Sequence, residues 1–284
     1  MNWFRKTIKK HFYYYFIRHR FAPAVSIVQR ELYLKYRSLP AEQLPPLKDT
    51  GFRVFSQFEE DGLLLYIFSL LGMDKKTFVE IGSADGINSN CANLYFHHGW
   101  HGVFIDADRD QVEIGRRFYA RHPHEWMYKP VFIQGKVTRE NINELITQGE
   151  VSGEIGLVSI DIDGNDYWVW DAIDVVQPQV VIIETHNEFG MNNIVVPYNP
   201  DYSFPGRHPV YHGASPVAMT RLAERKGYRL VGANQYGFNF IYIREDLLSD
   251  QLPAAQVEEL LKHPSAIKGM EKFEEIRDWE YLEG

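Results

Sequence analysis

The chain has 284 residues and a net charge of -8, so it lacks the overall positive charge on which nucleic-acid binding depends. Its length and 45% hydrophobic content suit one large domain with peripheral additions, and no apolar run predicts a transmembrane helix. A single cysteine, Cys91, excludes an intrachain disulfide. Because the N-terminus also lacks the features of a secretory signal, we expect a cytoplasmic protein.

The first 20 residues contain six Lys or Arg and no Asp or Glu. A helix would place Phe4, Ile8, Phe12 and Phe16 on one side, with most of the lysines elsewhere. Such a helix suits peripheral attachment to an anionic inner membrane. It equally suits packing on its own domain or on a second subunit of a homo-oligomer, where the acidic C-terminal stretch would complement its charge. The sequence leaves these partners open.

Three prolines at positions 40, 45 and 46 predict a linker, and a new unit is expected to begin near Val54. The elements predicted next are a helix over residues 60–71, strands over 77–81 and 102–106, a helix over 111–120, a strand over 131–134 and a helix over 139–146 that Thr138 would cap. Two buried strands over 156–162 and 179–185, a helix over 215–226 and a hairpin of 228–234 with 239–245 follow. This alternation predicts an α/β sheet of right-handed crossovers, followed from residue 253 by an acidic helical segment.

The stretch "FVEIGSADGINSN" interrupts a strand with an acid and follows it with small residues. Gly82, Ala84 and Gly86 allow the backbone of a turn to approach a ligand closely. The pattern lacks the glycine spacing of a dinucleotide fingerprint, and Glu80 is suited to an amino group rather than to a pyrophosphate. Asp106 ends the next strand, where a carboxylate can bind ribose hydroxyls. Together these residues point to S-adenosylmethionine as the cofactor.

Acidic residues gather where the fourth and fifth strands end. Asp161 and Asp163 share one face of their strand, and Glu184 and His186 follow the next strand at the same spacing. A divalent cation such as Mg²⁺ would find ligands in Asp161, Glu184 and His186. Asp161 is also a candidate cofactor ligand, whereas Asp166 is better explained as a cap of the following helix.

Without a metal, His186 is the first candidate for the general base that removes a proton from a hydroxyl, because imidazole titrates near neutral pH. Asp161 would then orient the acceptor, and His212 is a second candidate base.

Two further segments are expected to border the site. Gln57, in the segment before the first strand, is a candidate cofactor ligand. The long, proline-rich and aromatic stretch over residues 194–213 suits a lid or an acceptor-binding loop, in which Tyr198, Tyr202 and Arg207 would contact a sugar and an anionic substituent.

The segments "FSQFEEDG", "FVEIGSADG", "GWHGVFIDAD", "VSIDIDGNDYWVWDAI" and "VVIIETHNEFG" resemble the FkbM-like group of class I S-adenosylmethionine-dependent methyltransferases over about two thirds of the chain. The resemblance implies a Rossmann-like fold with a mostly parallel seven-stranded sheet, helices on both faces, and helical extensions at both ends. The expected division is an N-terminal extension over 1–50, the methyltransferase domain over 51–250 and a C-terminal extension over 251–284. Asp163 stands where the group commonly has Glu.

The leading hypothesis is therefore an S-adenosylmethionine-dependent O-methyltransferase that acts on a hydroxyl of a bacterial glycan or another sugar-containing acceptor, with or without a divalent cation. Two alternatives are a metal-dependent glycosyltransferase, because Asp161 and Asp163 form an Asp-x-Asp element, and a non-catalytic glycan-binding or scaffold module. The glycosyltransferase does not account for the glycine turn.

Overall fold

The computed structural model describes residue 15, residues 17–121 and residues 129–284. Apart from Tyr15 and residues 17–20, the predicted basic aromatic helix lies outside the described residues. Among the described residues, no helix combines the length and apolar character needed to span a membrane.

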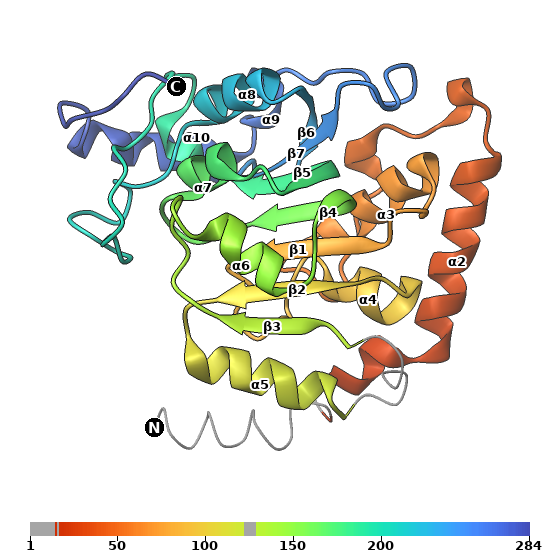
Figure 1. The fold of residues 1–284 in the computed structure, drawn as a ribbon. Helices are drawn as coiled ribbons and strands as arrows, with labels where there is room; N and C mark the ends of the chain where they lie inside the picture. The colour runs from red at the N-terminus through yellow and green to blue at the C-terminus, as the bar shows by residue number, and fades with distance from the viewer. Residues whose placement is uncertain (1–14, 16, 122–128) are drawn as a thin grey trace.

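One mixed sheet of seven strands organises the molecule, in the order β3-β2-β1-β4-β5-β7-β6 (Figure 1). The strands are β1 (Thr77–Ile81), β2 (His101–Asp106), β3 (Val131–Gln134), β4 (Gly153–Ile160), β5 (Val176–Glu184), β6 (Tyr228–Ala233) and β7 (Asn239–Arg244). The first five are parallel, and β7 runs antiparallel to both β5 and β6. The chain order reverses between β1 and β4, and in open α/β sheets ligands bind at such a switch point, beyond the carboxyl ends of the strands.

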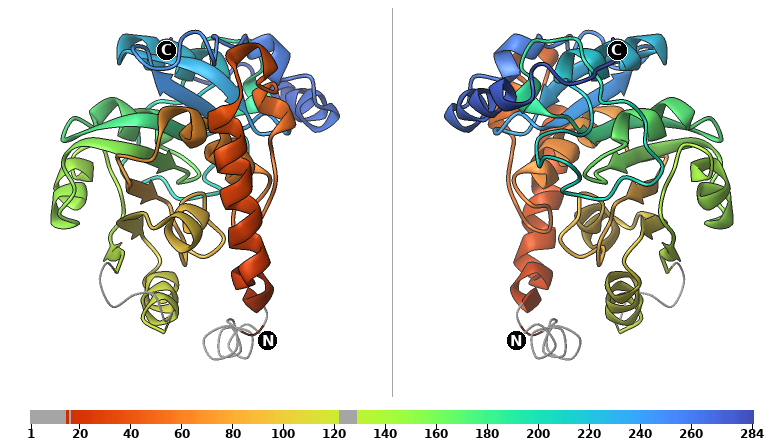
Figure 2. Two further views of the ribbon diagram at one scale, coloured as in Figure 1. Left: turned by 90° about the vertical axis from the view of Figure 1, so that its right-hand side faces the viewer. Right: turned by 90° about the vertical axis from the view of Figure 1, so that its left-hand side faces the viewer.

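Helices cover both faces of the sheet (Figures 1 and 2). On one face lie α6 (Ile142–Gln148), α7 (Asp166–Ala172) and α8 (Pro216–Arg225), and on the other lie α3 (Glu60–Leu71), α4 (Ala92–His98) and α5 (Arg109–Tyr119). Each face of the sheet has its own hydrophobic core, and alternating residues of β1 point to opposite faces. Val79 and Ile81 face α6 and α7, whereas Phe78 faces α3 and α4. The predicted sheet and its two helical layers are confirmed.

Several predicted boundaries are confirmed to the residue, namely α3, β1 and β3. Strands β4 and β5 each begin three residues earlier than predicted, at Gly153 and Val176. The prediction of a Thr138 cap is wrong, because the helix begins at Ile142, and the Asn141 side chain instead accepts a hydrogen bond from the Thr138 N–H at 2.8 Å.

Helix α2 (Pro23–Ser38) lies outside α3 and α4 (Figure 2). Buried amide groups tie it to α4, since the side chains of Gln29 and Asn93 exchange hydrogen bonds of 3.0 and 2.9 Å. The predicted linker between α2 and α3 also packs on the domain, because Leu47 is buried and the Tyr66 hydroxyl donates to the Pro45 carbonyl at 2.8 Å. This part of the N-terminal extension therefore packs against its own domain.

The C-terminal segment forms α9 (Val257–Leu260), α10 (Pro264–Met270) and the short helix η5 (Glu271–Glu275). It packs on η4 (Asn187–Phe189) and on the segment over residues 190–213 through a small separate core. The buried members of that core are Phe189, Val210, Phe273 and Ile276. Val195 and Leu282 exchange two backbone hydrogen bonds of 2.9 Å. The C-terminal segment thus holds the loop that follows β5.

Candidate functional site

The turn after β1 comes into close contact with the end of β4. Gly82 has φ +81°, and a Cβ atom at this position would lie 1.6 Å from the Asp161 carbonyl oxygen. Only glycine fits both the left-handed conformation and this approach. Gly86, with φ +65°, lies lower in the turn, where the Tyr119 hydroxyl donates to its carbonyl at 2.5 Å. The glycines therefore bring the ends of β1 and β4 together at the switch point.

Asp106, at the end of β2, holds this turn from the other side. Its two carboxylate oxygens accept hydrogen bonds from the backbone N–H groups of Ala84 at 2.6 Å and Asp108 at 2.7 Å. Ala84 has φ +48°, a conformation that side chains disfavour and that this bond stabilises. Asp106 therefore shapes the turn while its carboxylate borders the cleft beside it.

Glu80 lies beneath the turn, with 5% of its surface exposed. Its carboxylate accepts hydrogen bonds from the Ser89 hydroxyl at 2.8 Å and from the N–H groups of Asn90 and Cys91, both at 3.1 Å. Burial raises its pKa, and these hydrogen bonds oppose the shift. In this arrangement Glu80 organises residues 89–91 and does not border the cleft, so its direct bond to a cofactor amino group stays a prediction.

A cleft of about 430 Å³, here called the first cleft, opens beyond the carboxyl ends of β1, β2 and β4. Its lining includes Gly82, Ala84, Asp106, Gly135, Lys136, Asp161, Asp163, Asn165, Tyr202, Ser203 and Phe204. Three of these residues are carboxylates and one is a lysine, so the cleft favours a ligand with positive charge over a polyphosphate.

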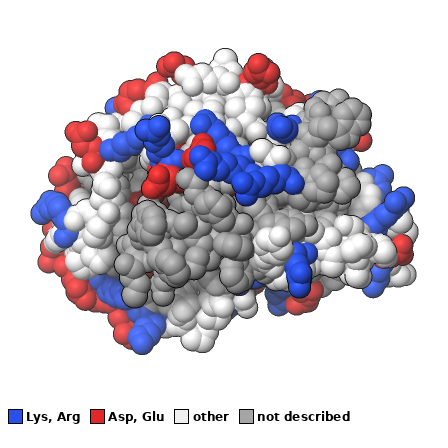
Figure 3. All heavy atoms as spheres, turned by 90° about the horizontal axis from the view of Figure 1, so that it is seen from below, with Lys and Arg blue, Asp and Glu red and all other residues white. Residues whose placement is uncertain are grey.

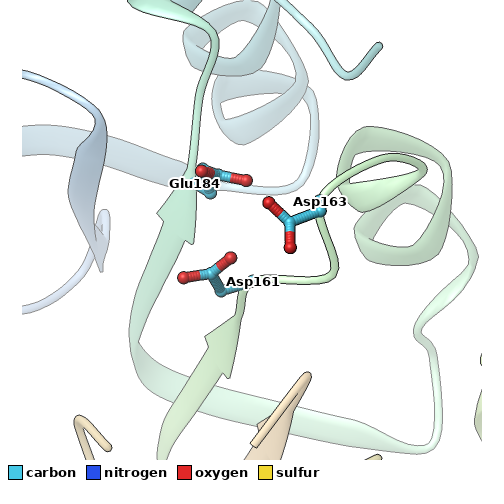
Figure 4. Close-up of side chains that lie close together, drawn as sticks. All are labelled: Asp161, Asp163 and Glu184. Atoms are coloured by element: carbon cyan, nitrogen blue, oxygen red, sulfur yellow. The ribbon is translucent and has the colours of Figure 1, made fainter. Parts of the chain in front are cut away.

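Carboxylate oxygens of Asp161, Asp163 and Glu184 lie within 4.8 Å of one another where β4 and β5 end (Figure 4). Burial, followed by the charges of Asp166 and Asp163, raises the pKa of Asp161 to about 8. Burial and the charge of Asp161 raise the pKa of Glu184 well above its usual value. Within the described part of the chain the cluster therefore lacks compensating positive charge, and a cation beside it would favour the ionised carboxylates.

Asp166 closes the turn between β4 and α7. Its two carboxylate oxygens accept hydrogen bonds from the N–H groups of Ile162 at 2.9 Å and Gly164 at 3.0 Å. The prediction that Asp166 caps α7 is therefore wrong, because Asn165 stands at the N-cap position and Asp166 instead holds the turn that precedes the helix.

A second cleft of about 430 Å³ adjoins the first, and the two share Asn165, Tyr202 and Ser203. Its other lining residues include Tyr198, Asn199, Asp201, Arg207, Tyr211, His212 and Glu280. Arg207 stacks on the Trp279 ring at 4.6 Å, and Arg139 stacks on the Tyr198 ring at 4.2 Å. The segment over 190–213 supplies most of this cleft, and residues 164–165 with Glu280 of the C-terminal segment complete its lining.

His186 and His212 meet beside the second cleft, with His186 Nε2 2.8 Å from His212 Nδ1. On the other side of its ring, His186 Nδ1 lies 3.3 Å from a carboxylate oxygen of Glu188. Burial opposes the ionisation of Glu188, but the hydrogen bond and charge of His186 lower its pKa to about 2. Burial and the charge of His186 lower the pKa of His212 to about 3. A carboxylate and two imidazoles thus form a continuous row.

The predicted site residues divide among these places. Gly82, Ala84, Asp106 and Asp161 line the first cleft, and Tyr198, Arg207 and His212 line the second, with Tyr202 in both. Gln57 is exposed on the segment before α3, outside either lining. The predicted metal ligands were Asp161, Glu184 and His186. The structure instead brings Asp163, rather than His186, close to Asp161 and Glu184.

Sequence reasoning missed Glu188 as a partner of His186, although the two residues stand two positions apart directly after a strand. It also missed Lys136 and Ser203, which carry no recognisable motif and reach the first cleft through the paths of their loops.

No protein-family model matches the chain, and no curated protein matches it. Solved structures with a similar fold include an O-methyltransferase from Bacillus cereus in complex with SAH, at 14% identity over 76% of this chain and 89% of that chain, with a TM-score of 0.41. Another is magnesium protoporphyrin IX methyltransferase from Synechocystis with bound SAM, at 8% identity over 65% and 77% and a TM-score of 0.41. A third is a caffeoyl-CoA O-methyltransferase homologue from Staphylococcus aureus, at 18% identity over 64% and 82% and a TM-score of 0.42.

All three TM-scores lie below 0.5, so the fold assignment rests on the sheet of this chain. The sheet order, with the reversed β7 between β5 and β6, is that of the Rossmann-like class I methyltransferase fold expected from the sequence.

Proposed function

We propose that the protein is an S-adenosylmethionine-dependent O-methyltransferase of the FkbM-like group that methylates a hydroxyl of a glycan or another sugar-containing acceptor. The observation that carries the proposal is the pair of adjoining clefts at the switch point of the sheet, the first bordered by the glycine turn and carboxylates and the second by aromatic and polar side chains.

The charge of the first cleft supports this cofactor. S-adenosylmethionine supplies a methyl group on a positively charged sulfonium and also carries an ammonium group. Asp106 borders the place where ribose hydroxyls would bind, and across the cleft lie Asp163 and Asp161, whose raised pKa a cationic ligand would lower. A dinucleotide would instead bring a pyrophosphate against these carboxylates.

The second cleft supports a sugar acceptor. Tyr198, Tyr202 and Tyr211 offer ring faces on which the apolar face of a sugar can stack, and Asn199 and Asp201 offer polar groups for its hydroxyls. The Tyr202 hydroxyl is buried and lacks a hydrogen-bond partner among the described residues. Because Tyr202 and Ser203 border both clefts, an acceptor hydroxyl at their boundary would lie next to the donor methyl, and positioning would supply much of the catalysis.

A divalent cation is the other candidate occupant of the acidic cluster. Asp161, Asp163 and Glu184 provide oxygen ligands, and the raised pKa values of Asp161 and Glu184 fit a site that lacks positive charge. A cation bound there would polarise the acceptor hydroxyl.

Calorimetric titration with S-adenosylmethionine, with and without Mg²⁺, tests the proposal. We expect Asp106→Asn to weaken binding by more than about tenfold, since the loss of one good charged hydrogen-bond acceptor exceeds about 1.4 kcal/mol. Asp108→Asn is the matched control, because Asp108 also accepts backbone hydrogen bonds, from Asp110 and Gln111, but does not line the cleft.

The same titration separates the alternatives. Binding that appears only with Mg²⁺ would place the cation in the site together with the cofactor. The absence of binding under every condition, with a nucleotide sugar giving heat instead, would replace the proposal with the glycosyltransferase.

A further inference from the structure

The row formed by Glu188, His186 and His212 extends from the small C-terminal core to the lining of the second cleft. His186 directly follows β5, Glu188 belongs to η4, and His212 lies 26 residues after His186 in the chain. The two histidines have 8% and 4% of their surfaces exposed, and their ring centroids lie 3.8 Å apart at 82°. Such burial of two titratable rings in direct contact calls for a physical reason.

The backbone around the rings is shaped for their contact. The His186 N–H donates to the Ala214 carbonyl at 2.8 Å, which fixes residues 212–214 beside the end of β5. Gly213 has φ +69°, and a Cβ atom there would lie 2.8 Å from Cδ2 of His186. Glycine is therefore required for the two imidazoles to approach each other.

The carboxylate determines where the protons lie along the row. Nδ1 of His186 lies 3.3 Å from the Glu188 carboxylate without hydrogen-bond geometry, and a carboxylate at that distance favours a proton on Nδ1, which makes Nε2 of His186 the acceptor. His212 then donates from Nδ1 to that nitrogen, which leaves Nε2 of His212 as the basic nitrogen. The chain of donors and acceptors thus has a single direction, from the second cleft toward Glu188.

We propose that His212 is the catalytic base that takes the proton of the acceptor hydroxyl, and that His186 and Glu188 are positioning residues that fix its tautomer. The inference rests on the proposed methyl transfer. His212 suits this role because it lines the second cleft and its ring lies 5.7 Å from those of both Tyr202 and Phe204, which border the first cleft.

The step balances as follows. The acceptor oxygen forms a bond to the methyl carbon while the carbon–sulfur bond of the donor breaks, and the sulfur keeps the electron pair and becomes neutral. The hydroxyl proton moves to Nε2 of His212. The positive charge then rests on the His212 imidazolium, whose Nδ1–H still donates to Nε2 of His186. The charge of Glu188 and the Pro209 carbonyl also favour a protonated His212.

Kinetics with a panel of methyl glycosides and nucleotide sugars provide the first test. We expect His212→Ala to lower kcat by about 100-fold to 10,000-fold, the usual contribution of a general base, and to change the Kd for S-adenosylmethionine less than about twofold. Added imidazole should restore part of the rate. Glu188→Gln should lower kcat by less and leave the acceptor KM unchanged.

His208→Gln is the matched control. His208 belongs to the same segment and pairs with Glu275 at 3.3 Å, the same distance as His186 and Glu188, but it does not line the second cleft. A kcat of His212→Ala close to that of the wild type, or a rate loss that imidazole cannot restore in a folded variant, would overturn the proposal.

A second measurement needs no acceptor. Nitrogen NMR of histidine-labelled protein should show Nδ1 protonated and Nε2 unprotonated on both His186 and His212, and Glu188→Gln should alter this pattern. A His212 ring with its proton on Nε2 at neutral pH would exclude the row as drawn. Failure of the wild type to bind S-adenosylmethionine would instead refute the proposed function and leave the tautomer result standing.

Discussion

Gly82 is the residue on which the first cleft most directly depends, because its backbone touches the Asp161 carbonyl. Gly82→Ala would force the ends of β1 and β4 apart and would also place a side chain at φ +81°. We expect a loss of stability greater than about 3 kcal/mol, from a steric clash added to an unfavourable conformation, together with loss of cofactor binding. Urea unfolding and calorimetry would measure both effects.

Gly227 provides the matched control for this substitution. Its φ is +82°, but a Cβ atom there would meet nothing within 4 Å. Gly227→Ala should therefore cost only about 1–2 kcal/mol, the price of the left-handed conformation, and leave cofactor binding intact. Equal losses in the two variants would show that the contact with Asp161 contributes nothing.

Asp161 should make stability depend on pH. Its folded pKa of about 8 lies above the usual value of 3.8, so the native state binds a proton more tightly than the unfolded state. The stability contributed by that proton is therefore present at low pH and is lost as the pH rises toward 8. Asp161→Asn, which stays neutral, should raise the Tm more at pH 8 than at pH 5.

Relief of even 1 kcal/mol would raise the Tm by about 2–4 °C in a domain of roughly this size, which thermal unfolding without cofactor or metal can detect. Asp201→Asn, an exposed acid in the neighbouring loop, should leave the Tm unchanged at both pH values. A Tm shift in Asp161→Asn that does not vary with pH would contradict the raised pKa of Asp161 in the native state.

At the scale of elements, the "EEDG" sequence connects the start of α3 to one distant segment and to the segment just before it. The buried carboxylate of Glu60 accepts hydrogen bonds from the side chains of Asn234 and Asn239, both at 3.0 Å, and so holds the β6–β7 hairpin. Asp61 accepts three backbone hydrogen bonds from residues 54–56, at 2.6, 2.6 and 2.9 Å. The motif therefore acts by organising the fold around the site.

Glu60→Ala would leave two buried amide groups without acceptors, and we expect a loss of about 2–4 kcal/mol in unfolding free energy. Glu59→Ala is a suitable comparison, because Glu59 bonds the same hairpin through Gln235 but at an exposed contact. Chemical denaturation should show the larger effect for Glu60. A smaller loss for Glu60 than for Glu59 would contradict the anchoring role.

The sequence predicted most elements because hydrophobic patterns report local burial. Strand β1 was bounded correctly, since an apolar run ends in the small residues that follow Ile81. Capping was harder, because the Asn141 side chain bonds back to the Thr138 N–H and the helix begins only at Ile142. The contact of His186 with His212 could not be predicted, since it depends on the path of a 26-residue connection that lacks periodicity.

At the scale of the whole molecule, the second cleft joins the segment over 190–213 to residues about 70 positions later. Trp279 stacks under Arg207, and the Tyr211 hydroxyl donates to the Glu280 carbonyl at 2.6 Å. We expect Trp279→Ala to raise the acceptor KM about threefold to tenfold, as loss of a cation–π contact and its packing would, with an unchanged Kd for S-adenosylmethionine. Steady-state kinetics would measure the acceptor KM, and calorimetry the Kd for S-adenosylmethionine.

Glu283→Ala, an exposed change in the same segment, should leave the acceptor KM as it is. A weakened cofactor Kd in Trp279→Ala would show that the two clefts are not separately supported.

The face that carries α5 and the beginning of α2 also bears Lys and Arg side chains (Figure 3). The basic character of the first 20 residues leads us to expect co-sedimentation with vesicles containing phosphatidylglycerol. Replacing Lys6, Lys9 and Lys10 with Glu should abolish it. The control replaces three exposed lysines of the C-terminal segment with Glu, namely Lys262, Lys268 and Lys272, and should still co-sediment. Equal pelleting of the two variants would refute the expectation.

The separate core beneath the second cleft has an evolutionary consequence. Residues 82–165 supply most of the first cleft, whereas the second cleft is lined mainly by 190–213, with Glu280 from the C-terminal segment that packs on it. Under the proposed function, related enzymes could therefore exchange these two segments as a pair and acquire a new substrate without altering the first cleft. A chimaera that receives only one of the two segments would have a mismatched core between them. Substrate preference should therefore change only when both segments are exchanged together.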